Sequence, residues 1–368
     1  MKWSTFSGLV VASGAALFLA RKVLLPPRRT PDQVLEDVAR DSRRSGFRER
    51  EGLRELDRAL ADAELMRDEA LAVRILDLHA RILSELGAYP EAQADLTRIL
   101  RRYRPNDPDY ECQLADIAHL SGDEERALQL VRGILRRNPK HGQAWRQRGS
   151  YEERLATLAL EEACQTTRET LLTTEAAHGV ELLQKIAARD HSDPERVALA
   201  AELRELFLPR FERPLAVVLE KVDLASLSYS NARFAWSRSF TDRFDSDAVE
   251  GFMRLTKAAG RSELAADFGI AALAHPSLEQ DPALLATLFD VLESVGRSEQ
   301  LSRLLESIDW TEVEGDLDFF VDASRMLYLG EQWKPLSFAV PRMARLGGAV
   351  ESSYTSFYQG MTMIGLKR

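Results

Sequence analysis

Acid–base or metal chemistry needs histidines, cysteines or carboxylates at close spacing, and this chain of 368 residues places few of them together. Its six histidines include no pair at metal-ligand spacing: His79, His119, His141, His178, His191 and His275. Paired carboxylates such as Glu124-Glu125 and Glu161-Glu162 fall on expected helix surfaces, where charge is normally solvated. The motifs GxSxG, GxxxxGKS/T, GxGxxG and HExxH are missing from the sequence. The sequence therefore predicts a non-catalytic protein without a metal, a cofactor or a small-molecule substrate.

The segment 231–244 is the one stretch whose residue types are typical of nucleic-acid binding. Three aromatic residues and three arginines interleave there: Trp236, Phe240, Phe244, Arg233, Arg238 and Arg243. Stacking aromatics with arginines can bind single-stranded nucleic acid, but the aromatic spacing of four residues is also that of a helix face packed into a core. The net charge of −9 argues against a phosphate-binding surface. We therefore expect the aromatics in the core and no nucleic-acid partner.

Composition favours an all-α protein. Leu, Ala, Arg and Glu dominate, and these residues lose little side-chain freedom in a helix, whereas β-branched residues are sparse. Charged residues make up 29% and hydrophobic residues 45%, as in ordinary folded domains. The only cysteines, Cys112 and Cys164, belong to no CxxC motif, which indicates two free thiols in a reducing compartment.

Residues 3–20 contain no charged side chain. Eighteen helical residues span about 27 Å, enough to cross the hydrocarbon core of a bilayer. A cleaved signal peptide is the alternative, but a cut after Ala20 would place Phe18 at −3, where small residues are required. We therefore expect a single transmembrane anchor within 1–25.

Charge around this span predicts its orientation. Only Lys2 and the amino terminus precede it, whereas Arg21, Lys22, Arg28 and Arg29 follow it. The positive-inside rule places the larger, C-terminal part in the cytoplasm, which suggests the inner membrane of a bacterium. The same four cations are expected to contact lipid headgroups.

Glycines at a spacing of about 35 residues organise the body of the chain. Gly87 and Gly122 are 35 residues apart, and Gly260, Gly296 and Gly330 follow one another at 36 and 34. Alanine lies five residues after the first three of these glycines, and proline 16 to 18 residues after them. Glycine suits a turn between two helices because it adopts positive φ without a Cβ penalty, and proline ends the second helix.

This pattern resembles the tetratricopeptide repeat (TPR), a helix–turn–helix unit of 34 residues. The resemblance covers slightly under half of the chain and implies repeats at 73–106, 108–141, 246–279, 282–315 and 316–349. In a further repeat Trp145 takes the position of the first-helix tryptophan and Gly149 that of its small residue, but Ala156 stands at the turn position. In the last repeat Pro335 should delay the second helix. The sequence Gly-Arg-Ser-Glu occurs at 260–263 and 296–299. We expect Ser262 to cap the helix that follows and the Glu to suit the positive end of that helix's dipole, while the glycine spacing carries the architecture.

The expected fold is thus a TPR-like helical-hairpin solenoid preceded by a single transmembrane helix. The expected divisions are an anchor at 1–25, a juxtamembrane or linker helix at 26–72, repeats at 73–149, an irregular helical region at 150–245, repeats at 246–349, and a capping helix with a tail at 350–368.

The resemblance also implies a binding site, because the first helix of each tetratricopeptide hairpin lines a concave surface. Carried over by repeat position, the partner-binding residues are Arg74, Asp77, Arg81, Asp116, His119, Arg146, Glu250, Arg254, Asp290, Phe320 and Tyr328. Their mixed charge does not form an all-basic clamp for an acidic peptide terminus.

The combination of an anchor, a repeat array and no catalytic motif predicts a membrane-anchored scaffold or adaptor that binds other proteins. In layout it is similar to the lipopolysaccharide assembly protein B family, although the paired CxxC motifs of that family's rubredoxin-like module are missing. Two alternatives stay open: an assembly or transport factor of the cell envelope with the array outside the cytoplasm, and an enzyme with an unrecognised site in 150–245.

Overall fold

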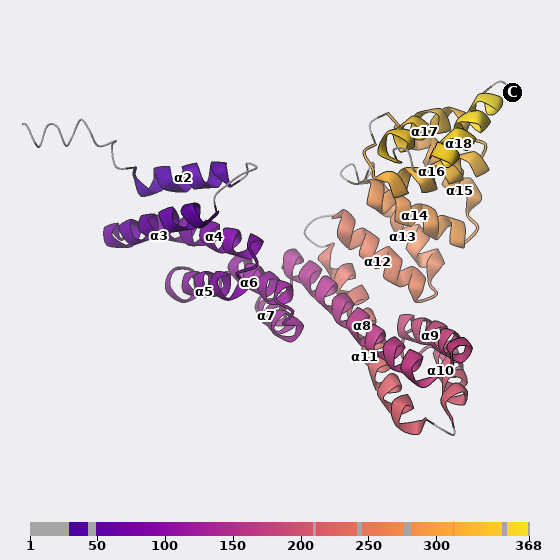
Figure 1. Ribbon diagram of the computed structural model, residues 1–368, viewed down its shortest axis with the longest axis horizontal. Helices are drawn as coiled ribbons and strands as arrows, with labels where there is room; N and C mark the ends of the chain where they lie inside the picture. Colours follow the sequence, from indigo (N-terminus) through magenta and orange to yellow (C-terminus); the bar gives the residue numbers. More distant parts are fainter. Residues whose placement is uncertain are drawn as a thin grey trace, which may run out of the picture. The chain divides into compact units, whose positions relative to one another are not determined.

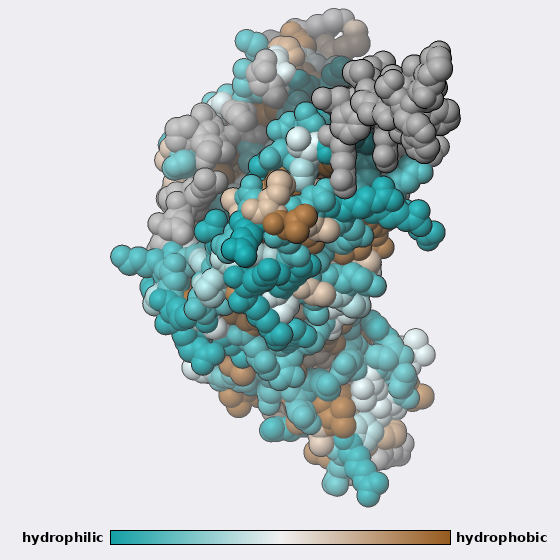
Figure 2. All heavy atoms as spheres, turned by 90° about the vertical axis from the view of Figure 1, so that its left-hand side faces the viewer, coloured by the Kyte–Doolittle hydropathy of each residue, from teal (hydrophilic) through white to brown (hydrophobic). Residues whose placement is uncertain are grey.

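A computed structural model describes residues 29–42, 49–208, 211–240, 245–275, 278, 281–311, 313–347 and 352–366. The expected span at 3–20 lies outside these residues, as does Phe244. Within them every regular element is helical, which confirms the all-α prediction (Figure 1). No helix in this part of the chain is both long and apolar enough to cross a bilayer. The chain divides into two compact units between Asp123 and Glu124. In the view of Figure 2, hydrophilic residues cover most of the visible surface.

The first unit is a series of helices that each pack against the next. They are α2 (Pro31–Asp41), α3 (Glu49–Met66), α4 (Glu69–Glu85), α5 (Tyr89–Arg98), the π-helix η1 (Ile99–Tyr103) and α6 (Pro108–Leu120). Thr30 starts α2 with a capping box that includes Gln33. Leu35 and Leu56, from the segment expected as a linker, lie in one core with Ile75. The pair α2 and α3 is therefore an additional helical hairpin ahead of the repeats.

The same turn closes each expected hairpin. Gly87, Gly122, Gly260 and Gly296 have φ between 70° and 84°. At each turn the glycine N–H and the next N–H donate to carbonyls three and five residues back; Gly87 donates to Ser84 and Ala88 to Leu83. This is the Schellman arrangement, which satisfies the last carbonyls of a helix. The predicted glycine turn is confirmed at these four positions.

The last hairpin turns one residue later than predicted. Gly330 has φ −83°, and Glu331 takes the positive φ of 55°. Gln332 N–H donates to the Leu327 carbonyl at 2.8 Å, which completes the same turn. The next helix starts at Trp333, two residues after the positive φ as in the hairpins before it but one residue later in the repeat, which is the delay expected from Pro335. Pro335 falls in the first helical turn, where its missing N–H costs little.

The second unit contains twelve described helices: α7 (Glu124–Arg137), α8 (Gly142–Thr170), α9 (Thr173–Ala188), α10 (Pro194–Phe207), α11 (Glu212–Ser239), α12 (Ser246–Ala258), α13 (Ser262–Leu273), α14 (Pro282–Ser294), α15 (Ser298–Ser307), α16 (Leu317–Leu329), α17 (Trp333–Gly347) and α18 (Ser352–Gly365). Helices α12, α14 and α16 pack successively, and each pairs with the helix that follows it. This is the packing that the tetratricopeptide resemblance implies. Helix α18 packs against α16 and α17 and buries Tyr358.

Helices α8 and α11 are the longest and lie side by side (Figure 1). Helix α8 runs for 29 residues without a break at Ala156, which is fully buried. Alanine favours continued helix where glycine would have favoured a turn. The Trp236 ring of α11 packs against Gly149 of α8 and Gly251 of α12, two positions with no side chain. These contacts fix α8, α11 and α12 against one another.

Candidate partner-binding face and pocket

Ion pairs connect α8, α12, α14 and α16 in the second unit. Arg254 of α12 pairs with Glu153 of α8. Lys257 of α12 lies with its Nζ 2.6 Å from Oδ2 of Asp290 in α14. Arg325 of α16 donates from both terminal nitrogens to Glu293 of α14, at 3.1 and 2.9 Å. We call these six residues the ion-pair row; it presents both signs of charge across α8, α12, α14 and α16.

Burial shapes the electrostatics at one end of this row. Burial raises the pKa of the Glu250 carboxyl, and the charge of Arg254 opposes that increase. For Arg254 itself, burial lowers the pKa, but the hydrogen bond and charge of Glu153 outweigh burial and raise it. Arg254 therefore remains a cation between the carboxylates of Glu153 and Glu250, and this end of the ion-pair row carries a permanent positive charge.

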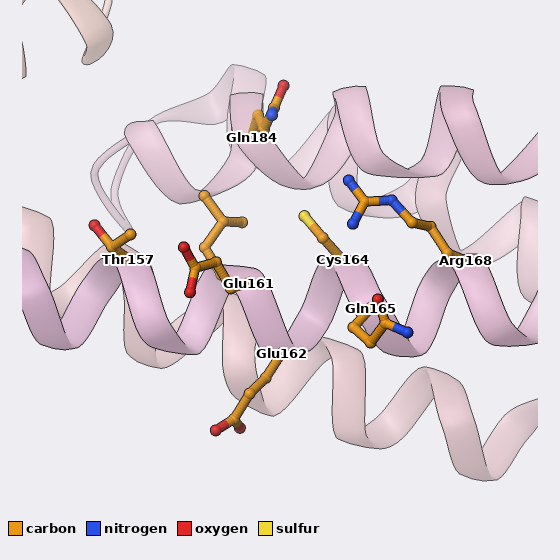
Figure 3. A pocket seen from close by; sticks show the side chains of 8 residues that line it. Thr157, Glu161, Glu162, Cys164, Gln165, Arg168 and Gln184 are labelled. Carbon is orange, nitrogen blue, oxygen red and sulfur yellow. The ribbon is translucent and has the colours of Figure 1, made fainter.

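A pocket of about 470 Å³ lies along α8, with Gln184 of α9 on its other wall. Figure 3 shows Glu161, Cys164 and Arg168 directed from α8 toward the side of α9, while Glu162 turns away. Glu162 instead pairs with Lys221 of α11 at 2.5 Å. The volume is within the range of small-ligand sites.

The pocket offers both hydrogen-bond donors and hydrogen-bond acceptors beside apolar surface. The carboxylate of Glu161, the guanidinium of Arg168 and the side-chain amides of Gln165 and Gln184 supply both acceptors and donors. Burial raises the pKa of the Cys164 thiol, so the sulfur is protonated at neutral pH and is a poor nucleophile. Within the described ranges, no group of three His, Cys, Asp or Glu side chains could hold a metal ion. The pocket suits the backbone and polar side chains of a peptide segment.

The pocket and the ion-pair row adjoin one another. Thr157 lines the pocket and lies one helical turn after Glu153, the α8 member of the row. The Thr157 hydroxyl lies 3.5 Å from the hydroxyl of Tyr229 in α11. A partner segment lying on α12 and α8 can therefore contact the row and the pocket together.

The structure brings three of the predicted site residues together and separates the others. Glu250, Arg254 and Asp290 lie at the row. Phe320 is 1% exposed and lies in the core, so it offers no surface to a partner in this structure. Tyr328 is half-buried and packs edge-on against the rings of Trp333, Phe357 and Tyr358.

Five predicted residues lie in the first unit. Arg74 pairs with Asp32 at 3.2 Å, and Arg81 pairs with Asp77 at 2.9 Å. Asp116 and His119 are half-buried on α6.

Two other predictions concern Arg146 and the headgroup-contact residues. Arg146 belongs to the second unit and lies 3.4 Å from Asp245. Of the four expected lipid contacts, only Arg29 is among the described residues, and it pairs with Glu55 at 3.0 Å.

The core interpretation of the aromatic stripe is confirmed for its first two members. Trp236 is 7% exposed, and the Phe240 ring lies 5.0 Å from the ring of Phe268. Arg233 is directed away from solvent, 12% exposed and paired with Asp190. No open row of stacked aromatics and arginines forms among the described residues of this segment.

The arginine of the repeated Gly-Arg-Ser-Glu has a role that the sequence did not predict. It reaches the preceding part of the array: Arg261 pairs with Asp190 at 3.1 Å, and Arg297 pairs with Asp267 at 2.6 Å and with Glu263 of the first copy. The expected cap by Ser262 is wrong, because Arg261 is the N-cap residue and no side chain caps α13. The arginine thus links neighbouring parts of the array, whereas the serine does not cap the helix in either copy.

Comparison with known proteins identifies no relative in sequence, since no family model and no curated protein matches the chain. Among the solved structures that resemble it, three illustrate the low identity. A tetratricopeptide repeat protein from Parabacteroides merdae is 15% identical over 90% of this chain and 99% of that one, with a TM-score of 0.39. Pseudomonas aeruginosa PilF is 11% identical over 80% and 99%, with a TM-score of 0.43. The C-terminal part of a repeat protein from Cytophaga hutchinsonii is 12% identical over 92% and 98%, with a TM-score of 0.31. Because these scores are low, the repeat assignment rests on the turns and packing described above.

Proposed function

We propose that this protein is a non-catalytic adaptor, anchored in a membrane through residues 3–20, that binds a segment of another protein with its second unit. The observation that carries the proposal is the continuous surface formed by the ion-pair row and the α8 pocket. The apolar N-terminal stretch supports the anchor, and the cations that follow it support a cytoplasmic array.

The chemistry of this surface favours a peptide segment over a small molecule. Opposite charges alternate along the row, so a partner with both signs of charge is complementary to it. The pocket adds side-chain amides, which hydrogen-bond well to an exposed peptide backbone. A segment with alternating charges and free backbone groups is therefore the expected partner.

Site-specific photo-crosslinking in native membranes tests the binding face. A photoreactive phenylalanine analogue at Gln184, which is exposed in the pocket, should give a discrete adduct whose partner is then identified by mass spectrometry. The same analogue at Gln129, an exposed glutamine of α7, is the matched control. Adducts of equal yield at both positions, or an adduct at Gln129 alone, would exclude the pocket as the binding face.

Topology is tested separately with reporters fused after Arg368. A reporter that works only in the cytoplasm should be active, and one that works only outside it should be silent. The opposite pattern would favour the alternative of an envelope assembly or transport factor with its array outside the cytoplasm, and it would leave the crosslinking result unaffected.

A further inference from the structure

Helix α11 exposes a row of large apolar side chains on the face opposite the core. Val217, Leu224, Leu227 and Phe234 are 46%, 38%, 49% and 52% exposed. The other face of the same helix is fully buried at residues such as Val222. Apolar side chains aligned on one exposed helix face typically mark an interaction site.

The spacing of this row is that of a two-helix seam. Positions 217, 224 and 231 repeat every seven residues, and so do positions 220, 227 and 234, offset by three. These are the a and d positions of a heptad pattern that covers about 26 Å of helix. Two of the six positions are polar, Glu220 and Asn231, and polar seam residues set the register and direction of pairing.

We propose that this seam is a homodimer interface in which α11 pairs antiparallel with α11 of a second copy. One register places Leu224 opposite Leu227 of the second copy, and Val217 opposite Phe234. In that register Glu220 meets Asn231 of the second copy, so its carboxylate accepts a hydrogen bond from the amide. Each apolar residue meets an apolar one and each polar residue a polar one, and every pairing is reciprocal, as a two-fold interface requires.

The polar pair decides between antiparallel and parallel pairing. In a parallel dimer each seam residue meets its own copy, so Glu220 would face Glu220, and like charges held together in an interface cost several kcal/mol. The antiparallel register removes that repulsion and satisfies both polar groups.

The residues beside the seam permit close approach. On one side lie Ala216, Asp223, Ser230 and Ser237, which are small or short. Asp223 is already paired with Arg196 of α10, so its charge is compensated within one copy. Phe234 is positioned by an edge-on contact with Trp145 of α8, at 5.7 Å between ring centroids. The helix is ordered before it pairs, so dimerisation does not have to order it.

Molecular mass tests the interface. The full chain, purified in density-matched detergent and followed by sedimentation equilibrium, should associate to dimers. Leu227→Glu should weaken the dimer about thirtyfold or more, as expected for a central contact of an interface. Leu264→Glu changes a leucine of the same exposure, 50%, on α13 and should leave the dimer intact. A wild-type monomer throughout, or equal effects of the two substitutions, would refute the proposal.

Direction is tested by disulfide formation between chains. Chains with Glu220→Cys mixed with chains with Asn231→Cys should form a disulfide-linked dimer under mild oxidation, while each variant alone should form little. The native Cys112 and Cys164 are buried, so the unsubstituted chain is the background control. Crosslinking of the Glu220→Cys chain with itself would establish the parallel arrangement, and an unlinked mixture would exclude this seam.

Discussion

Gly149→Ala tests how tightly α8, α11 and α12 are fixed together. A Cβ added at Gly149 would lie 2.7 Å from Cδ2 and Cε2 of Trp236 and 3.1 Å from Cε3. The ring has little room to shift, because a Cβ added at Gly251 of α12 would lie 3.0 Å from its Cε2 and Nε1. The substitution therefore forces a packed junction apart.

Two opposing terms set the magnitude. Replacing glycine by alanine inside a helix gains about 1 kcal/mol. Carbon atoms in contact are most stable about 3.5–4.0 Å apart, so the ring must move by about 1 Å, and overpacking of this kind costs about 1–3 kcal/mol. The difference between these terms should lower the free energy of unfolding of Gly149→Ala by up to about 2 kcal/mol.

Gly133→Ala supplies the matched control within the same unit. Gly133 lies inside α7, and its added Cβ would meet only the end of the flexible Arg137 side chain, at 4.0 Å. That variant should gain the helix-propensity term of about 1 kcal/mol without a packing cost.

Urea denaturation followed by circular dichroism should rank Gly133→Ala above the wild type and Gly149→Ala below it. A change in the slope of the transition, as well as in its midpoint, would reveal that only part of the array unfolds. In a Trp236→Phe background, Gly149→Ala should lower the free energy of unfolding by less, because the smaller phenylalanine ring relieves the clash with the added Cβ. If Gly149→Ala matches Gly133→Ala, the junction is not tightly packed and the reasoning fails.

Three further predictions follow from single residues. Ser262→Ala should leave the urea midpoint unchanged, whereas Asp281→Ala, which removes the side-chain cap of α14, should cost about 1 kcal/mol. Arg297→Gln should lower the thermal midpoint slightly at low salt, with no difference from the wild type at high salt, because its carboxylate partners are exposed. The hydrogen bond from Tyr103 lowers the pKa of Glu64 below its ordinary value of 4.5. Burial opposes this change, and the nearby arginines add to it. A carboxylate with a lowered pKa in the folded state stabilises the fold at pH values above its ordinary pKa, and this stabilisation is lost as the pH falls through the folded-state pKa. Glu64→Gln should therefore flatten the acid side of the stability–pH curve measured by urea denaturation.

The hairpin turns were the most predictable part of the fold. A glycine with positive φ is a local requirement, and four of the five predicted turn glycines have it. The fifth failed by one residue, because Gly330 is the C-cap residue of α16 with a negative φ and Glu331 adopts the positive φ of the turn. Spacing alone cannot separate two adjacent positions when packing of the next helix decides which one turns.

Contacts between hairpins could not be predicted from the sequence. The serine of Gly-Arg-Ser-Glu was expected to act locally, but the arginine acts at a distance, since Arg297 reaches Glu263 one hairpin earlier. The α8 pocket has the same character, because its second wall comes from Gln184 on another helix. Periodicity shows which face of a helix is buried, and it does not show which helix lies opposite.

The two faces of α11 separate folding from association. Trp236 points into the junction with α8 and α12, whereas Phe234, two residues earlier, is half exposed on the seam. Leu227→Glu should therefore weaken dimerisation without lowering the unfolding midpoint at concentrations where the wild type is monomeric. Gly149→Ala should lower the unfolding midpoint without weakening dimerisation, because the seam residues remain in place. Loss of dimerisation in Gly149→Ala under folding conditions would show that the Trp236 junction also sets the position of α11, and so that core packing controls the interface.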